Sequence, residues 1–289
     1  MMKSIKKNVS SYLLDAKNEI FNADAILAYW SDGDLNNWGD ALNPILIHNI
    51  SGKWPTLARP HINIKNKPVF RVVGSILDGC SDRNAVIWGS GFISASGKFM
   101  TEPRSICAVR GPLTRDLIIK QGIECPEVYG DPALLYPIFY CPNINKKYEL
   151  GIVPHYIDKN SPLLKQFEGR SDVKIINIQG GINDFVDDIC GCKRIASSSL
   201  HGIIASDAYG IPSTWVKLSE NVVGNGFKFL DYFLSVGRLE REPLTISKKT
   251  TISDIYDSFN PYTINIDLNH LLEVCPFNKC SSQKNERKY

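Results

Sequence analysis

The sequence predicts an α/β protein of two domains, each built from repeated strand–turn–helix units. Short apolar runs recur along the chain, and several end in glycine, as parallel strands do where they enter ligand-facing turns. The chain has 289 residues, 43% of them hydrophobic, which is enough for two moderate cores. The alternation of predicted strands and helices is interrupted by the polar, proline-containing stretch 142–147 and resumes after it. We therefore expect an N-terminal domain over residues 1–145 and a C-terminal domain over residues 146–289.

The N-terminal half begins with a basic segment that reads as an amphipathic helix, because Asp15 and Glu19 interrupt its apolar residues. Buried strands are predicted at Ala25–Tyr29, Val69–Gly74, Ala85–Gly91, Ser105–Arg110 and Val128–Tyr129. Helices are predicted at Ala41–Ile50, with Pro44 in its first turn, and at Leu113–Gln121 after a Gly-Pro pair.

The C-terminal half repeats the pattern and ends in a polar tail from Lys279 to Tyr289. Its predicted strands are Leu150–Pro154, Val173–Gln179, Arg194–Ala196 and Ser213–Leu218. Its predicted helices are Ser161–Phe167, Ile182–Ile189, Ile203–Tyr209, Thr251–Phe259 and Ile264–Val274.

Composition excludes several classes of protein. The net charge is only +3 and the basic residues are scattered, which argues against nucleic acid as a partner. No apolar stretch approaches the roughly 20 residues of a membrane span, so we expect a cytoplasmic protein with at most peripheral contact at the inner face of the membrane. The eight cysteines are expected to be reduced thiols, and Cys190 and Cys192 are too close for a usual zinc pair, so no metal site is predicted.

The stretch from Ala196 to Pro212 is the first candidate for a functional site. A strand end, a polar turn with Ser199 and His201, and a helix start together form an anion site, because first-turn N–H groups point outward unpaired. Gly202 allows close approach of the backbone to a ligand. An ordinary turn with a capping serine fits these residues equally well.

A second polar concentration, with Asn37, Gly39 and Asp40, follows the first predicted strand. Ligands bind at the carboxyl ends of strands in α/β folds, although Asp40 could also be a simple helix N-cap. The glycines around Ser90 lack the third glycine of a dinucleotide fingerprint, and no Gly-Lys-Ser phosphate loop is present.

Taken together, these stretches resemble the polysaccharide pyruvyl transferase family over roughly residues 24–240. The matching motifs are 37–43 (NWGDALN), 109–116 (VRGPLTRD), 129–133 (YGDPA), 198–202 (SSLHG) and 224–232 (GNGFKFLDY). Each motif is weak alone, but their order and spacing are specific. The resemblance implies two Rossmann-like domains facing a cleft, in a glycosyltransferase-B-like architecture.

The resemblance also implies a reaction. Members transfer the enolpyruvyl carbon of phosphoenolpyruvate (PEP) onto two sugar hydroxyls, forming a cyclic pyruvate ketal and releasing phosphate. PEP is then a donor substrate and no cofactor is expected, while the acceptor is a sugar of a cell-surface polysaccharide, free or lipid-linked. Better-studied members carry Arg-Leu-His where this chain has Ser199-Leu200-His201, so another basic residue must replace that arginine, or the donor differs.

Roles for individual residues follow from this chemistry. His201 is expected to protonate the methylene carbon of PEP, because a histidine pKa lies near the working pH. Asp40 is expected to accept the hydroxyl proton, with Asp131 in reserve. The expected substrate-binding residues are Asn37, Gly39, Arg110, Arg115, Asp131, His155, Ser199 and Lys228. Arg115 could instead form a surface ion pair, and Asp131 could hold its own turn.

Two other functions stay open at this stage. A nucleotide-sugar glycosyltransferase of the same architecture would need an acidic residue for the ribose, for which Asp207 is a candidate inside a helix. A non-catalytic carbohydrate-binding relative is compatible with Ser199 in place of arginine. A serine hydrolase is excluded, because the chain has no Gly-x-Ser-x-Gly elbow.

Overall fold

The computed structural model describes residues 24–31, 37–58 and 66–277, so the predicted N-terminal helix and the polar tail lie outside the described residues. The described chain forms two five-stranded sheets in which every pairing is parallel. The first sheet contains β1 (Leu27–Ala28), β2 (Thr56–Leu57), β3 (Val69–Arg71), β4 (Ala85–Trp88) and β5 (Ser105–Ala108). The second contains β6 (Leu150–Val153), β7 (Val173–Ile175), β8 (Ile195–Ser197), β9 (Ser213–Lys217) and β10 (Leu244–Thr245).

Both sheets have the same strand order. The first runs β2-β1-β3-β4-β5, and the second, read from its other edge, runs β7-β6-β8-β9-β10. In each sheet the chain starts at an inner strand, moves to one edge, and then crosses to the opposite side. The direction therefore reverses between β1 and β3, and again between β6 and β8. Ligands of parallel α/β sheets bind outside the carboxyl ends of the strands at such switch points.

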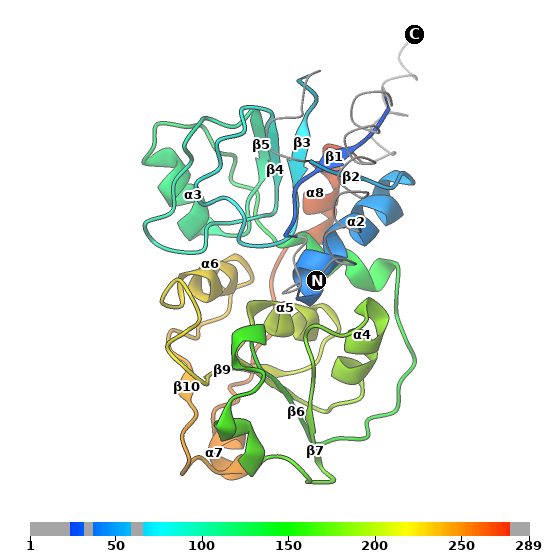
Figure 1. Ribbon diagram of the computed structural model, residues 1–289, viewed down its shortest axis with the longest axis vertical. Coiled ribbons are helices and arrows are strands. Elements are labelled where there is room, and N and C mark those ends of the chain that lie inside the picture. The colour runs from blue at the N-terminus through cyan, green and yellow to red at the C-terminus, as the bar shows by residue number, and fades with distance from the viewer. Residues whose placement is uncertain (1–23, 32–36, 59–65, 278–289) are drawn as a thin grey trace, which may run out of the picture.

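Helices cover the sheets and fill the layer between them, where α5 and α6 lie in Figure 1. The α-helices are α2 (Trp38–Ser51), α3 (Pro112–Ile119), α4 (Ile182–Cys190), α5 (Leu200–Ala208), α6 (Phe227–Ser235), α7 (Ile252–Asp257) and α8 (Leu268–Glu273). Three 3-10 helices are η1 (Pro132–Ile138), η2 (Tyr156–Asp158) and η3 (Pro162–Gln166). None of the helices in the described part of the chain is long and apolar enough to cross a bilayer.

The two halves pack together through one shared hydrophobic cluster. It includes Trp38 and Val73 from the first half and Ile203 and Phe233 from the second. Helix α3 packs on α6, and η1 packs on α5. The C-terminal α8 returns to the first sheet, where the indole Nε1 of Trp88 donates to the carbonyl of Leu271 at 2.8 Å. The boundary at residues 145 and 146 stays a prediction.

Two helices begin earlier than the sequence suggests. Helix α2 starts at Trp38 because the N-cap is Asn37, whose side chain accepts from the backbone N–H groups of Gly39 and Asp40. Asp40 is therefore not the N-cap, and Pro44 lies inside the helix beyond its first turn. Helix α5 starts at Leu200 rather than Ile203, which puts His201 in its first turn. The predicted helix 161–167 is the 3-10 helix η3.

Candidate active site

A cavity of about 220 Å³ lies where the switch points of the two sheets meet. Most of its walls come from the chain after β1 and β3 in the first half and after β6 and β8 in the second. Ile93, after β4, and Val223 and Lys228, after β9, complete the lining. Six of the ten predicted site residues line it: Asn37, Asp40, His155, Ser199, His201 and Lys228.

The first turn of α2 forms one wall of the cavity. The side-chain amide of Asn37 donates to Oδ2 of Asp40 at 2.6 Å, which fixes the carboxyl group at the cavity surface. Burial raises the pKa of Asp40 to about 6, although the positive charge of Lys228 opposes this rise. Asp40 therefore exchanges a proton close to neutral pH, as a general base or acid requires.

Gly39 lies against the imidazole ring of His201. A Cβ added at Gly39 would lie 2.2 Å from Cε1 and from Nε2 of that ring, far inside van der Waals contact. Only glycine therefore allows the first turns of α2 and α5 to approach this closely. The role predicted for Gly39 changes accordingly, because it makes room for the catalytic candidate His201 and does not itself line the cavity.

Asp131 lies next to His201 and does not line the cavity. It is completely buried, and its Oδ1 accepts from the backbone N–H of Ala133 at 3.0 Å at the start of η1. Its Oδ2 faces Nε2 of His201 at 4.0 Å. Within the described residues, these two buried atoms have no hydrogen-bond partner. A buried polar atom without a hydrogen-bond partner lowers the free energy of unfolding. A small movement that brings the two atoms within hydrogen-bond distance would give each of them a partner.

The Asp131–His201 pair is better described as two neutral groups than as an ion pair. Burial raises the pKa of Asp131 to about 7. Burial, together with the positive charges of Lys228 and Arg110, lowers the pKa of His201 to about 3. Below pH 7 the carboxyl group of Asp131 is therefore mainly protonated, while the imidazole of His201 is neutral. A negative charge placed in the cavity would offset the cations and favour transfer of the proton to the imidazole.

Lys228, from the first turn of α6, is the one lysine or arginine among the described residues that line the cavity. Burial and the charge of Arg110 lower its pKa to about 8, and Asp40 opposes this shift. It remains mostly protonated at neutral pH and gives the cavity a cation. His155 lies nearby at the end of β6, and burial and Lys228 lower its pKa to about 3, so its imidazole is neutral.

Ser199 is the N-cap of α5, and its side chain makes no capping hydrogen bond. In the first turn of this nine-residue helix the N–H of Gly202 donates to the carbonyl of Ser199 at 3.1 Å, whereas Leu200 and His201, whose N–H groups precede it, line the cavity together with Ser199. A helix N-terminus of this kind favours an anion.

Arg110 is fully buried behind the cavity rather than in its lining. Its guanidinium donates to Oδ2 of Asp231 at 3.0 Å, to Oγ of Ser75 at 2.7 Å and to the carbonyl of Phe92 at 2.6 Å. Asp231 belongs to α6, so Arg110 ties the end of β5 to the helix that carries Lys228. Through these contacts Arg110 positions the helix that carries Lys228 and does not itself line the cavity.

Arg115 is not brought to the cavity. Its Nε donates to the carbonyl of Cys125 at 3.1 Å, and the side chain lines a separate surface depression next to α3 and β5. The structure therefore does not bring the guanidinium group of Arg115 to the residues with which it was expected to bind the donor.

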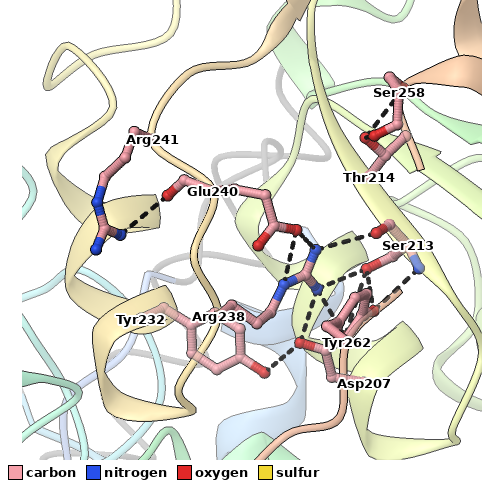
Figure 2. A network of polar contacts seen from close by, with 9 residues as sticks. All are labelled: Asp207, Ser213, Thr214, Tyr232, Arg238, Glu240, Arg241, Ser258 and Tyr262. Carbon is pink, nitrogen blue, oxygen red and sulfur yellow. Dashed lines mark hydrogen bonds and ion pairs between the residues drawn. The ribbon is translucent and has the colours of Figure 1, made fainter. Parts of the chain in front are cut away.

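A buried polar network, which sequence reasoning missed, holds α5 against α6 (Figure 2). Asp207 of α5 accepts from the hydroxyl of Tyr232 of α6 at 2.9 Å, from Arg238 at 2.8 Å and from the hydroxyl of Tyr262 at 2.6 Å. The network therefore fixes the helices that carry His201 and Lys228. Because these hydrogen bonds occupy the buried carboxylate of Asp207, it is not the ribose ligand that a nucleotide-sugar enzyme would need.

Comparison with known proteins adds independent findings. A family model of polysaccharide pyruvyl transferases matches residues 1–220, a range that contains nine of the ten predicted site residues and leaves out Lys228. The uncharacterized protein L143 of Acanthamoeba polyphaga mimivirus is 35% identical over 195 residues, 62% of this chain. The chain spans 63% of the length of that relative. The succinoglycan biosynthesis protein ExoV of Rhizobium meliloti (strain 1021) is 28% identical over 235 residues, which cover 78% of this chain and 70% of ExoV.

Proposed function

Because the chain belongs to the polysaccharide pyruvyl transferase family, we propose that it transfers a pyruvyl group from PEP to a sugar of a polysaccharide, with formation of a ketal and release of phosphate. The observation that carries the proposal is the cavity at the two switch points. It gathers a cation, a helix N-terminus, an imidazole and a carboxyl group that exchanges a proton near neutral pH. The similarity to ExoV, a succinoglycan biosynthesis protein, supports a polysaccharide as the acceptor.

The donor would bind through its negative charges. PEP carries a phosphate and a carboxylate, and Lys228 with the first turn of α5 offers a cation and backbone N–H groups at one place. Lys228 is the basic residue that could replace the arginine expected at Ser199. Its burial strengthens the attraction, since a charge pair is screened less away from bulk water.

His201 would supply the proton to the methylene carbon of PEP. Nε2 faces Asp131, so Nδ1 is the ring nitrogen that remains for the donor. The phosphate charge would offset Lys228 and Arg110 and thereby raise the pKa of His201 when the donor binds. Asp131 would stabilise the resulting imidazolium and keep its orientation, as buried carboxylates do behind catalytic histidines.

The bond changes then balance as follows. Protonation of the methylene carbon gives a methyl group and an oxocarbenium-like centre, which one sugar hydroxyl attacks. Loss of phosphate regenerates an electrophilic carbon, and a second hydroxyl of the same sugar attacks it. The sugar loses two hydroxyl protons. One of them restores the acid that protonated the methylene carbon, and the other leaves with the phosphate. Asp40, ionised above its pKa of about 6, would accept a hydroxyl proton.

Several finer points belong to the same proposal. The two sheets would form Rossmann-like domains in a glycosyltransferase-B-like arrangement, divided between residues 145 and 146, and no cofactor would be needed. The acceptor would be a cell-surface polysaccharide or its lipid-linked precursor, modified in the cytoplasm. The parallel sheets of identical strand order support the first point.

The test is acceptor-dependent release of phosphate from PEP with galactosides, glucosides and N-acetylmannosamine-containing acceptors. We expect His201→Ala to abolish release, and His270→Ala, at an exposed histidine of α8, to preserve it. Release that survives His201→Ala would remove His201 from its role as the acid. Consumption of a sugar nucleotide in place of PEP would contradict the proposal and favour a glycosyltransferase.

A further inference from the structure

A second cavity, of about 360 Å³, lies beside the candidate active site at the carboxyl ends of β9 and β10. Neighbouring residues of the chain divide between the two cavities. Ser198 lines the second and Ser199 the first, and Val222 lines the second and Val223 the first. The two cavities are therefore neighbours that meet along these two stretches of the chain.

One wall of the second cavity is aromatic and fixed in place. The indole of Trp215 stacks on Phe229 with a centroid separation of 4.5 Å and an interplanar angle of 13°. Gly226, with φ +78°, lies against the indole edge, and a Cβ there would be 2.7 Å from Cη2 of Trp215. Trp215 is 8% exposed and Phe229 2%, so this wall offers the cavity a narrow, fixed apolar strip against which the apolar face of a sugar ring can pack.

The rim of the second cavity is polar and slightly acidic. It contains one lysine and two glutamates, Lys217, Glu220 and Glu242, so their formal charges sum to −1. Lys217 is paired with Glu220 at 2.7 Å, which leaves the carboxylate of Glu242 without a cation among these three residues. Carboxylates accept hydrogen bonds from hydroxyl groups but repel phosphates. The rim therefore suits an uncharged polyhydroxylated ligand and disfavours a nucleoside diphosphate.

We propose that this second cavity binds the sugar residues of the acceptor that adjoin the one receiving the pyruvyl group. The protein would then act on an oligosaccharide or polymer and not on a single free sugar. This inference rests on the proposed function for the reaction in the first cavity. It adds the place where the neighbouring units of that acceptor bind, so that a chain of uncharged hexose units would extend from the cationic cavity, beside Lys228, to the aromatic one.

The test measures sugar binding by calorimetry without PEP. The probes are methyl glycosides of galactose, glucose and N-acetylmannosamine and the corresponding trisaccharides. We expect at least one trisaccharide to bind ten or more times more tightly than its methyl glycoside, because only the trisaccharide reaches the second cavity. Trp215→Ala and Glu242→Ala should each weaken trisaccharide binding on the order of tenfold and leave binding of the methyl glycoside unchanged.

Glu168→Ala is the matched control, because this exposed glutamate lies outside both cavities. Trp215 belongs to the core, so exposed Glu242 decides the test if Trp215→Ala fails to fold. The inference is overturned if no trisaccharide binds more tightly than its methyl glycoside, or if Glu242→Ala has no effect. Binding of uridine diphosphate that Trp215→Ala abolishes would also overturn it. Tight trisaccharide binding without phosphate release from PEP would instead contradict the proposed function alone.

Discussion

Replacing Gly39 by alanine is the sharpest test of how the site is assembled. The added Cβ would lie 2.2 Å from Nε2 of His201, whereas carbon and nitrogen atoms in ordinary contact are about 3.5–4.0 Å apart. The imidazole must therefore move by about 1.5 Å, or α2 must shift by a similar amount. A misplacement of about 1 Å at a reacting group can cost on the order of a hundredfold in rate. We expect kcat for phosphate release to fall by at least that factor.

The effect on folding works in two directions. Alanine in a helix is more favourable than glycine by about 1 kcal/mol, which offsets part of the overlap with His201. Asn49→Ala, at an exposed position of the same helix, is the control that changes helix propensity without touching the imidazole. Activity would be measured together with the NMR chemical shifts of the imidazole. A folded Gly39→Ala protein with wild-type kcat and unchanged shifts would refute the packing that we describe.

Three further substitutions test the charges around the site. Burial raises the pKa of Asp131 from 3.8 to about 7, so stability present below pH 3.8 is lost as the pH rises through 7. Asp131→Asn removes this loss, so its unfolding free energy relative to wild type should rise by on the order of 2 kcal/mol between pH 5 and pH 8; a pH-independent difference would contradict the raised pKa of Asp131. Lys228→Met should raise KM for PEP at least tenfold, because it removes the cation at the cavity, whereas Lys217→Met, on the rim of the second cavity, should leave KM unchanged. Equal effects of the two substitutions would exclude Lys228 as the cation that binds PEP. Arg238→Met leaves Asp207 buried without its countercharge and should lower the free energy of unfolding, measured in urea, by about 3–5 kcal/mol. Adding Asp207→Asn to the same chain should restore part of that loss, whereas an Arg238→Met protein as stable as wild type would contradict the network in Figure 2.

The elements that could be predicted from sequence are those with a strong local signal. Apolar runs ending in glycine or a polar turn mark the strands of both sheets, because a parallel strand is buried on both faces. The edge strands β2 and β10 were not predicted, since each has only two residues and is defined by pairing with a neighbour. Helix α6 was missed as well. Its sequence, FKFLDYFLS, is rich in aromatic residues of modest helix propensity and is stabilised by packing on α3.

The site was predictable where position along a strand decides position in space. Asp40, His155 and His201 follow strand ends, and parallel strands bring their carboxyl ends to one edge. The approach of Asp131 to His201 was not predictable, because it depends on how η1 packs on α5, seventy residues away in sequence. Arg115 was misplaced for a related reason: residue type alone indicates what a side chain can bind but not where the helix points it.

The most direct measurement of the central claim is the NMR spectrum of an acceptor oligosaccharide after incubation with PEP that carries carbon-13 at its second carbon. We predict that the label appears in a quaternary carbon bonded to two oxygens of one sugar ring, in an amount equal to the phosphate released. His201→Ala should leave the label in PEP. Label found only in free pyruvate, or an acceptor that gains a sugar from a nucleotide donor instead, would contradict pyruvyl transfer in this cavity.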